Sequence, residues 1–259
     1  MIDLVVDARG VATLTLARAD KHNALSQAMI DALTQTAARI AADRRIRVVV
    51  LAAEGPTFCA GGDLGWMRDQ IAADTPTRRA AATSLARMLG ALNTLPQPLI
   101  GRIHGNAFGG GVGLACVCDV AIGVEAARFG LTETRLGLIP ATIGPYVLAR
   151  MGEAKARRVF MSGRVFGAEE AVALDILARA VPPAALDDAI EVEVAPYMSC
   201  GPKAVAAAKA FARSLGPVID EATIARSIDA LVACWDGDEA AEGISAFFDK
   251  RSPQWPGLT

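Results

Sequence analysis

The spacing of apolar residues predicts a strand pair at the start of the chain and a helix after it. Within residues 4–16, apolar residues alternate on both sides of Arg9 and Gly10, which is typical of a β-hairpin. Ser26 favours the start of a helix, because serine side chains often accept hydrogen bonds from the first free amides of a helix. The apolar residues that follow fall near helical spacing, and they are Met29, Ile30, Leu33, Ala37 and Ile40.

Apolar runs of strand length recur further along the chain, each followed by a turn or a helix. Residues 47–53 are apolar almost throughout, as expected of a strand that is covered on both faces. A helix predicted after this strand ends before Pro96 and Pro98, because proline cannot continue a helix. The predicted strands are 47–53, 99–104 and 119–123, and the predicted helices are 77–93 and 112–118.

These elements predict an α/β core and a helical C-terminal region. Strand, glycine-containing turn and helix recur through residues 1–195, which we therefore expect to form the core and to hold the ligand site. From about residue 183 strand patterns are absent, and alanine-rich helical patterns continue to Lys250. Residues 196–259 are therefore predicted to form a C-terminal helical region, either a small domain or a docking arm.

Charge and hydropathy narrow the classes of function. The 259 residues carry 26 Lys and Arg against 28 Asp and Glu, and this balance argues against a nucleic-acid binder. The most apolar window, residues 107–124, contains three consecutive glycines and Asp119, so a buried helix and strand are favoured over a membrane span. The first residues lack a basic segment before a long apolar stretch, so we expect no export signal and a cytoplasmic protein.

The residues that most often hold metals and cofactors are scarce. Two histidines, His22 and His104, cannot build a multi-histidine metal site, and the Cys116-x-Cys118 spacing suits buried thiols better than zinc or redox chemistry. The glycine-rich segments contain neither Gly-Lys-Ser/Thr nor G-x-G-x-x-G, which phosphate loops and dinucleotide sites require. We therefore expect no metal and no prosthetic group.

Two glycine-rich turns, residues 55–63 and 105–113, leave their backbone amides bare. An amide at the start of a helix points outward as a hydrogen-bond donor, and the helix dipole strengthens it. Two such amides that converge on one point form an oxyanion hole. Tight packing of a helix against a strand is the alternative, and the glycine content alone favours that alternative.

A set of short motifs stands in the order and spacing of the crotonase family, which comprises enoyl-CoA hydratases and isomerases. The chain resembles this family from the loop at residues 18–25 to a C-terminal Phe-x-x-Arg-x-Pro signature, and the combination is far more specific than any one motif. The motifs are Phe58-Cys-Ala-Gly-Gly-Asp-Leu64, His104-Gly-Asn-Ala-Phe-Gly-Gly-Gly111, Cys118-Asp119, Phe129-Gly-Leu-Thr-Glu133, Leu136-Gly-Leu-Ile-Pro140 and Phe248-Asp-Lys-Arg-Ser-Pro253.

The resemblance implies a fold of repeated ββα units wound into a spiral, with C-terminal helices that drive assembly into a homotrimer or a dimer of trimers. It also implies that the substrate is an acyl-CoA thioester, handled without a prosthetic group. By motif position, the amides of Gly62 and Gly110 would bind the thioester oxygen and stabilise an enolate. Pre-aligned amides away from water can hold such a charge without reorganising.

Glu133 stands at the position of a catalytic glutamate of the family. Without the motif, a surface carboxylate paired with Arg135 is the favoured interpretation, whereas the motif leads us to expect a catalytic role. Burial in an acyl pocket would raise the pKa of this carboxyl toward working pH, as general acid–base catalysis requires. Glu133, Gly62 and Gly110 are therefore the expected catalytic groups.

Gly113 departs from the two-glutamate hydratases of the family, which carry a second glutamate at this position. Glu133 then either activates water alone and returns the proton, or acts with another polar group, for which Asp69 and Tyr146 are candidates. Another alternative is a shift of the double bond by a single base, as in family isomerases. A CoA-binding subunit without activity is a further alternative from another class of protein.

Further residues are assigned to the ligand by the same resemblance. The expected CoA-binding residues are Arg18, Lys21, Ala24, Leu25, Ala60, Asp63, Leu64 and Lys250. The expected substrate pocket residues are Trp66, Met67, Gly113, Pro140 and Tyr146. Simple packing is the alternative for Trp66 and Met67, and a solvated tail is the alternative for Lys250.

Three segments of the chain indicate the type of acyl group. Residues 64–67, 109–114 and 132–146 resemble bacterial hydratases of methylglutaconyl-CoA and isohexenylglutaconyl-CoA. Such substrates carry a second carboxylate, which would need an arginine in the pocket. The candidates are Arg68, Arg102 and Arg135, which the sequence alone does not rank.

Overall fold

The strands divide between two sheets in the computed structural model, which describes residues 1–255. The larger sheet has the strand order β1-β2-β3-β5-β7-β10, and the smaller has the order β4-β6-β8-β9. Pairing is antiparallel between β1 and β2 and between β8 and β9, and parallel between the other neighbours. The strands are β1 Ile2–Val6, β2 Val11–Leu16, β3 Val48–Ala53, β4 Thr57–Cys59, β5 Leu99–Ile103, β6 Asn106–Phe108, β7 Val120–Val124, β8 Arg128–Gly130, β9 Val165–Gly167 and β10 Arg179–Val181.

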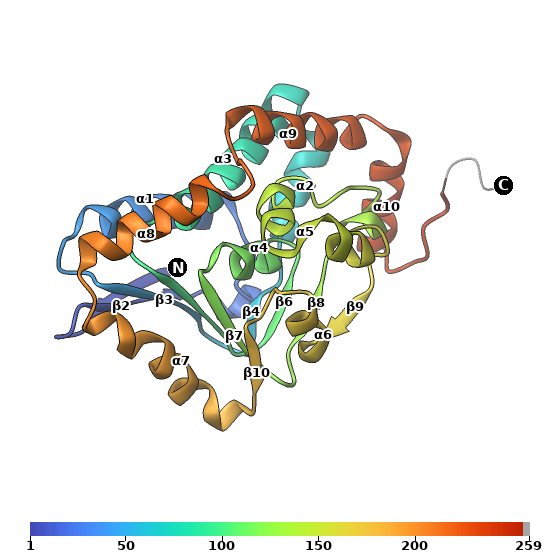
Figure 1. The fold of residues 1–259 in the computed structure, drawn as a ribbon. Coiled ribbons are helices and arrows are strands. Elements are labelled where there is room, and N and C mark those ends of the chain that lie inside the picture. Colours follow the sequence, from blue (N-terminus) through green and yellow to red (C-terminus); the bar gives the residue numbers. More distant parts are fainter. Residues whose placement is uncertain (256–259) are drawn as a thin grey trace.

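Consecutive strands alternate between the two sheets, and this alternation builds the spiral. β3, β5 and β7 lie in the larger sheet, and each is followed by a short strand, β4, β6 or β8, in the smaller one. Because each pair is followed by helical structure, every ββα unit advances the chain by one strand in both sheets at once. The predicted spiral of ββα units is confirmed (Figure 1).

Ten α-helices and four short 3-10 turns accompany the sheets in the described residues. Ser26 caps the first of them as predicted, with its hydroxyl oxygen accepting from the amide of Met29 at 3.4 Å. The α-helices are α1 Gln27–Ala42, α2 Leu64–Ala72, α3 Thr75–Asn93, α4 Gly110–Val117, α5 Gly144–Phe160, α6 Ala168–Ala173, α7 Leu186–Val194, α8 Pro202–Ser214, α9 Glu221–Trp235 and α10 Asp238–Phe248. The 3-10 turns are η1 Ala19–Lys21, η2 Glu133–Leu136, η3 Pro183–Ala185 and η4 Ala195–Met198. Within residues 1–255, none of the helices combines the length and the apolarity that crossing a membrane requires.

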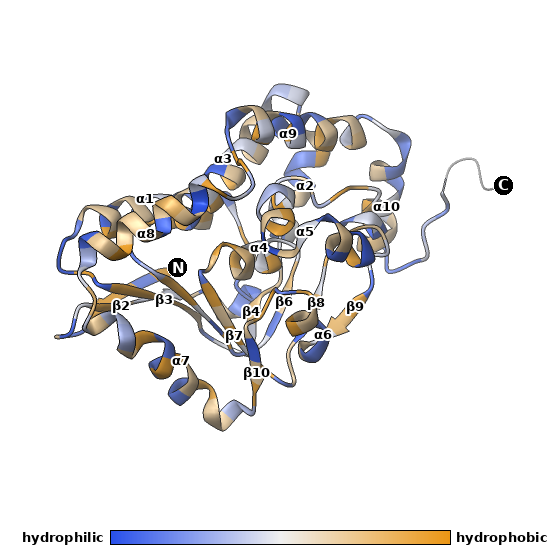
Figure 2. Cartoon of the chain, viewed as in Figure 1, coloured by the Kyte–Doolittle hydropathy of each residue, from blue (hydrophilic) through white to orange (hydrophobic). Residues whose placement is uncertain are grey.

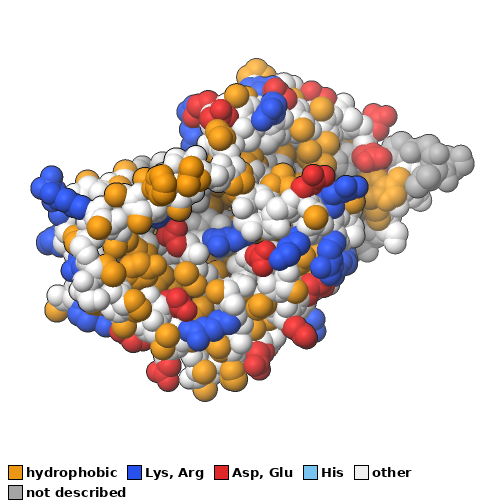
Figure 3. Space-filling view, viewed as in Figure 1, with side chains coloured by type: hydrophobic (Ala, Val, Ile, Leu, Met, Phe, Trp, Pro, Cys, Tyr) orange, Lys and Arg blue, Asp and Glu red, His pale blue; other side chains and the backbone are white. Residues whose placement is uncertain are grey.

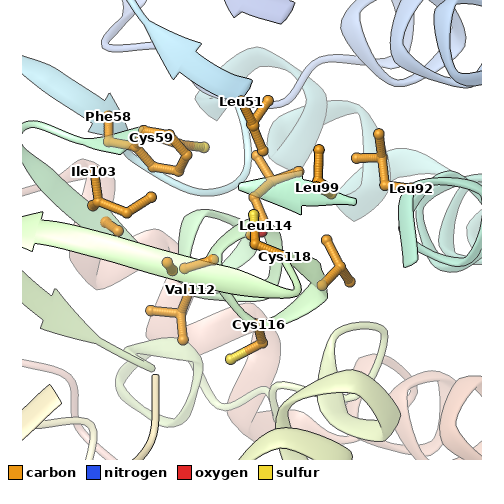
Figure 4. Close-up of a cluster of buried hydrophobic side chains, with 14 of the residues drawn as sticks. Leu51, Phe58, Cys59, Leu92, Leu99, Ile103, Val112, Leu114, Cys116 and Cys118 are labelled. Carbon is orange, nitrogen blue, oxygen red and sulfur yellow. Dashed lines mark hydrogen bonds between the residues drawn. The ribbon is translucent and has the colours of Figure 1, made fainter. Parts of the chain in front are cut away.

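The hydrophobic core lies between the sheets and α4. Figure 4 shows Leu51 and Leu99 from the larger sheet, Phe58 from the smaller sheet and Leu114 from α4 gathered in one cluster, and all four are fully buried. In Figure 2, β2 and β3 of the larger sheet are accordingly drawn largely in orange, the colour of hydrophobic residues. Three cysteines of this region are buried free thiols whose pKa burial raises to about 12, namely Cys59, Cys116 and Cys118.

The C-terminal helices fold back onto the core rather than away from it. Ile224 and Ile228 of α9 form a hydrophobic cluster with Ala82 and Ala86 of α3. In Figure 1, α9 runs beside α3 at the top of the view and α10 turns down the right-hand side. The helical character of residues 196–248 agrees with the sequence, while the boundary near residue 195 stays a prediction.

Backbone-to-backbone contact joins α10 to the turn η2. A methyl group on Gly243 of α10 would lie 2.5 Å from the carbonyl carbon of Leu136 in η2. Gly137, at the end of η2, has a φ of +68° and contacts the backbone of Glu239 in the same close way. Glycine at both positions therefore lets α10 support the turn that begins at Glu133.

Candidate active site

Two glycine turns meet at one edge of the smaller sheet. Gly61 and Gly62 follow β4, and Gly109 and Gly110 follow β6, the parallel neighbour of β4. Because the carboxyl ends of parallel strands lie at the same edge, the two turns come together, and a methyl group on Gly109 would lie 3.8 Å from Cα of Gly61. Gly61 and Gly109 have φ angles of +93° and +48°, which favour glycine.

A backbone bridge beside these turns leaves one amide unengaged. The amide of Leu25 donates to the carbonyl of Gly61 at 2.7 Å, and the amide of Asp63 donates to the carbonyl of Leu25 at 3.1 Å. This bridge uses the residues on either side of Gly62 and not Gly62 itself. Gly110 is the first residue of α4, where an amide has no acceptor within its own helix. Within the described residues, neither the Gly62 nor the Gly110 amide has a backbone acceptor.

Both turns open into a cavity of about 360 Å³, together with Glu133. Its walls come from the turns after β4 and β6, from η2 and the segment after it, and from residues of α1, α2, α3, α4, α9 and α10. Eight residues that the sequence analysis assigned to the site line it, namely Leu25, Ala60, Gly62, Trp66, Met67, Gly110, Glu133 and Pro140. The walls are mostly apolar, so a charge inside the cavity is separated from bulk water.

Glu133 presents a buried carboxyl to this cavity. It is the first residue of η2, directly beyond β8, and its Oε2 atom is buried with no hydrogen-bond partner in the described residues. A methyl group on Gly109 would lie 3.0 Å from Oε1, so the carboxyl lies beside the second glycine turn. Burial raises the pKa of Glu133 to about 7, against a weaker lowering by its own backbone amide. The alternative ion pair with Arg135 is absent among residues 1–255.

This raised pKa predicts a cost to stability that appears as the pH rises. The folded-state pKa of about 7 lies above 4.5, the ordinary pKa of a glutamate, so the folded protein holds the proton more tightly and loses stability as the pH rises between those two values. Glu133→Gln cannot ionise, and we expect it to gain about 2–3 kcal/mol of unfolding free energy relative to wild type between about pH 5 and pH 8. Urea unfolding of both proteins across this range measures the difference, and parallel pH curves would contradict it.

Two residues expected in the pocket lie behind its wall. A methyl group on Gly113 would lie 2.7 Å from Cγ2 of Ile143, a residue that does line the cavity. Ile143 therefore fills the space toward which a longer side chain at position 113 would grow. Tyr146 is buried and donates its hydroxyl to the carbonyl of Ala86 at 2.7 Å, and burial raises its pKa to about 12. Neither residue reaches the cavity.

Arg18 and Asp63 hold the first glycine turn in place. Arg18 Nη1 contacts Asp63 Oδ2 at 2.7 Å and also donates to the carbonyl of Ala24 at 3.1 Å. Asp63 in turn caps α2 by accepting from the amides of Gly65 and Trp66. Burial works to raise the pKa of Asp63, but these amides and Arg18 together lower it below its usual value. Both residues therefore support the turn from outside the cavity.

The remaining residues assigned to CoA lie away from the cavity walls. Lys21 is exposed at the end of η1, and Lys250 is exposed just after α10. Ala24 is buried under the loop at residues 18–25. Leu64 begins α2, and its side chain lies outside the described part of the structure.

The sequence analysis missed a wall that the C-terminal helices supply. Leu231 and Trp235 of α9 and Phe247 of α10 line the cavity, although all three lie in the region predicted only as helical. Helical periodicity shows which residues face inward but not which cavity they meet. It also missed Asn23, which is fully buried and donates to the carbonyls of Glu54 and Thr57.

The three candidate arginines separate clearly in space. Arg135 lines the cavity. Arg102 is engaged by Asp187 at 2.7 Å, and Arg68 lies over the ring of Phe248 with its guanidinium carbon 4.2 Å from the ring centre. The structure therefore brings one of the three to the cavity.

The chain is similar to known proteins over most of its length. A family model described as enoyl-CoA hydratase/isomerase matches residues 7–257. The solved structure of an enoyl-CoA hydratase from Shewanella pealeana is 38% identical, with a TM-score of 0.80 over 98% of this chain and 95% of that one. An enoyl-CoA hydratase from Mycobacterium smegmatis is 36% identical, with a TM-score of 0.79 over 98% of each chain. Mouse mitochondrial methylglutaconyl-CoA hydratase is 28% identical, over 96% of this chain and 80% of the mouse protein.

Proposed function

Since the chain belongs to the enoyl-CoA hydratase/isomerase family and is an enzyme of it, we propose that it adds water across the 2,3 double bond of an α,β-unsaturated acyl-CoA. The observation that carries the proposal is one buried carboxyl, Glu133, opening into the same apolar cavity as two unengaged amides, those of Gly62 and Gly110. The thioester itself is the substrate, and no prosthetic group takes part in the proposed reaction.

The two amides are proposed to bind the thioester oxygen. Addition of a nucleophile at C3 moves the double-bond electrons toward the carbonyl and places negative charge on its oxygen. The amides of Gly62 and Gly110 belong to two glycine turns whose backbones are in contact, so both donors can approach one oxygen. Because the surrounding walls are mostly apolar, each donor stabilises this charge more than it would in water.

Glu133 is proposed to carry out both proton transfers. Its carboxylate accepts a proton from water while the water oxygen bonds to C3 and the enolate forms. The protonated carboxyl then gives the proton to C2, the enolate electrons form the new C–H bond, and the thioester carbonyl is restored. A pKa of about 7 suits both steps, since the group is neither too weak a base nor too weak an acid near neutral pH.

A shift of the double bond is the second candidate, and a specific observation favours it. Ile143 fills the space beside Gly113, so the second carboxylate that would align a water molecule has no room there. A single base can take a proton from C2 of a 3-enoyl-CoA and deliver it to C4, which needs no water. The same amides would stabilise the dienolate that forms between the two transfers.

Two substrates separate the candidates. Hydration consumes a 2-enoyl-CoA and gives the 3-hydroxyacyl-CoA, whereas isomerisation converts a 3-enoyl-CoA into the conjugated 2-enoyl-CoA. Mass spectrometry distinguishes the products, because hydration adds one water and isomerisation leaves the mass unchanged. We expect the wild-type protein to add water to the 2-enoyl ester. Turnover of the 3-enoyl ester alone would assign the isomerase, and binding without turnover of either would assign an inactive CoA-binding subunit.

The proposed acyl group is of the branched glutaconyl type, with a carboxylate at its far end. Arg135 supports this proposal, because it is the member of the three candidate arginines that lines the cavity. A mouse relative of the chain is named methylglutaconyl-CoA hydratase. A guanidinium binds a carboxylate through charge-assisted hydrogen bonds, and its planar set of donors matches the two carboxylate oxygens.

Arg135→Met is expected to remove the preference for acyl groups that carry a carboxylate at their far end. Loss of a charge-assisted contact of about 1.5–3 kcal/mol should lower kcat/KM for a methylglutaconyl-type ester by about tenfold to a hundredfold. Crotonyl-CoA, which lacks the distal carboxylate, should change by less than about threefold. Steady-state kinetics on both esters measures the ratio, and Arg68→Met is the control because Arg68 stacks on Phe248 outside the cavity. An equal loss on both esters would contradict the assignment.

The proposal extends to the CoA end and to assembly. Lys21 and Lys250 are exposed cations that would meet the CoA phosphates outside the cavity.

We propose a homotrimer or a dimer of trimers, and α8 supports this because none of its residues is buried. Phe211, Leu215 and Val218 on and after α8 are 66%, 73% and 70% exposed, and hydrophobic side chains gather over α8 in Figure 3. Light scattering tests this by the mass in solution, and a monomer would contradict it.

A further inference from the structure

We propose that Arg78 is a positioning residue that joins two walls of the acyl cavity and thereby sets which acyl chains the protein accepts. One wall is α2, which carries Trp66 and Met67, and the other is the end of α9, which carries Leu231 and Trp235. Arg78 belongs to α3 and does not line the cavity itself. The effect on substrate choice rests on the proposed function.

One side of the guanidinium caps the C-terminus of α2. Arg78 Nε donates to the carbonyl of Gln70 at 2.8 Å, and Nη2 donates to the carbonyl of Ile71 at 3.0 Å. These carbonyls belong to the last turn of α2, where carbonyls lack partners within the helix and carry the negative end of its dipole. A guanidinium is well suited to this place, since it offers several donors in a fixed plane.

The other side of the guanidinium engages the end of α9. Arg78 Nη1 contacts Asp236 Oδ1 at 3.2 Å, and the guanidinium carbon lies 5.3 Å from the ring centre of Trp235. The Arg78 side chain is 15% exposed and that of Asp236 is 51% exposed, so the guanidinium is shielded from water on its own side of the ion pair. Trp235 lines the cavity, so Arg78 lies directly behind one of the wall residues.

Few contacts other than those of Arg78 fix α2. None of residues 65–72 belongs to the buried hydrophobic core, although the polar residue Gln70 is buried. The helix is otherwise held by the cap from Asp63 at its N-terminus and by Arg68, which lies over the ring of Phe248. A helix with so little buried apolar surface depends strongly on the groups at its ends. With Asp63 at one end and Arg78 at the other, the position of Trp66 and Met67 depends on both. Release of the Arg78 end would let this wall move away from Trp235 and widen the cavity.

The chain supplies a matched control in the next residue. Arg79 also joins α3 to α9, through Asp229 at 2.6 Å, but the two side chains are 45% and 61% exposed. Its recorded ion pair touches neither α2 nor Trp235. Exposed pairs of this kind contribute little to stability, so Arg79→Ala removes a similar charge between the same helices without removing the contacts of Arg78.

The test compares wild type, Arg78→Ala, Arg78→Lys and Arg79→Ala on straight-chain 2-enoyl-CoA esters of increasing length. We expect Arg78→Ala to raise KM for the best ester by about tenfold, to change kcat by less than about threefold, and to flatten the dependence of kcat/KM on chain length. Arg78→Lys should recover part of the dependence, because an ammonium keeps the charge but not the fork of donors. Arg79→Ala should keep the wild-type dependence.

A second readout does not depend on turnover. Hydrogen exchange of a peptide covering residues 64–72 should be faster in Arg78→Ala than in wild type and unchanged in Arg79→Ala. If the wild type turns over none of these esters, the proposed function is contradicted, but the proposal for Arg78 is not. Equilibrium binding of the same acyl-CoA series then measures how affinity depends on chain length. The proposed role of Arg78 would be overturned if Arg78→Ala kept the wild-type rate of hydrogen exchange in α2 and the wild-type dependence of kcat/KM on chain length.

Discussion

Glu133→Gln is expected to lower kcat by a factor of about a thousand or more on the best enoyl-CoA ester. A positioned acid–base group contributes about a hundredfold to ten-thousandfold to a rate, and here one carboxyl is assigned both proton transfers. Glutamine keeps the size of the side chain and its place beside Gly109 but can neither take nor give the proton. KM should change little, because the carboxyl acts on the reacting atoms rather than on the CoA. Steady-state kinetics measures both constants.

The pH dependence of kcat/KM gives a second test of the role of Glu133. The reactive form is the carboxylate, so kcat/KM of the wild type should fall as the pH drops below about 7, where burial has placed the pKa of Glu133. The residual rate of Glu133→Gln should lack this dependence. Tyr146→Phe is the control, because Tyr146 donates to Ala86 behind the wall, and it should keep most of kcat. Wild-type turnover by Glu133→Gln, or a large loss of kcat in Tyr146→Phe, would contradict the assignment.

Gly62→Pro is expected to cost about a hundredfold to a thousandfold in kcat. Proline removes the amide hydrogen, and loss of one oxyanion donor typically costs about 2.7–4 kcal/mol of transition-state stabilisation. The amide of Gly62 has no backbone acceptor within the described residues, so proline at this position removes no backbone hydrogen bond of the fold. The loss should appear in kcat, because the charge on the thioester oxygen develops in the transition state.

Gly62→Ala is the matched control for the added side chain. A methyl group there would lie 3.7 Å from Cγ of Met67 and 3.8 Å from the ring of Trp66, which is ordinary contact, and the amide is retained. We expect Gly62→Ala to keep kcat within about tenfold of wild type. Melting temperatures of both variants check that the fold survives. Equal activity of the two variants would show that the amide of Gly62 does not act on the substrate.

Local signals in the sequence predicted the longer elements and the places of two glycine-rich turns. The helix after Ser26 and the strand predicted at residues 47–53 have continuous patterns, and they formed as α1 and as β3 at Val48–Ala53. Glycine content alone favoured tight packing at the turns, and the expected role of their amides came from the family motifs. The positive φ angles of Gly61 and Gly109, which favour glycine, are seen only in the structure. Glu133 was found by its motif, since a lone glutamate near Arg135 carries no periodic signal.

Local sequence patterns could not predict the smaller sheet or the cavity wall that α9 and α10 form. Each strand of that sheet has three residues, as in Thr57–Cys59 and Asn106–Phe108, which is too short for an alternation to be recognised. Trp235 and Phe247 reach the cavity only because α9 and α10 fold back, a tertiary arrangement that no local spacing records. Gly113 matched a motif position, but its surroundings depend on Ile143, thirty residues further along.

The most direct measurement is a crystal structure of Glu133→Gln with a bound 2-enoyl-CoA ester. The account predicts the thioester oxygen about 2.7–3.1 Å from both the Gly62 and the Gly110 nitrogens, with the residue 133 side chain facing C2 and C3. A thioester oxygen held by only one of these amides, or a residue 133 side chain turned away from the acyl carbons, would contradict it.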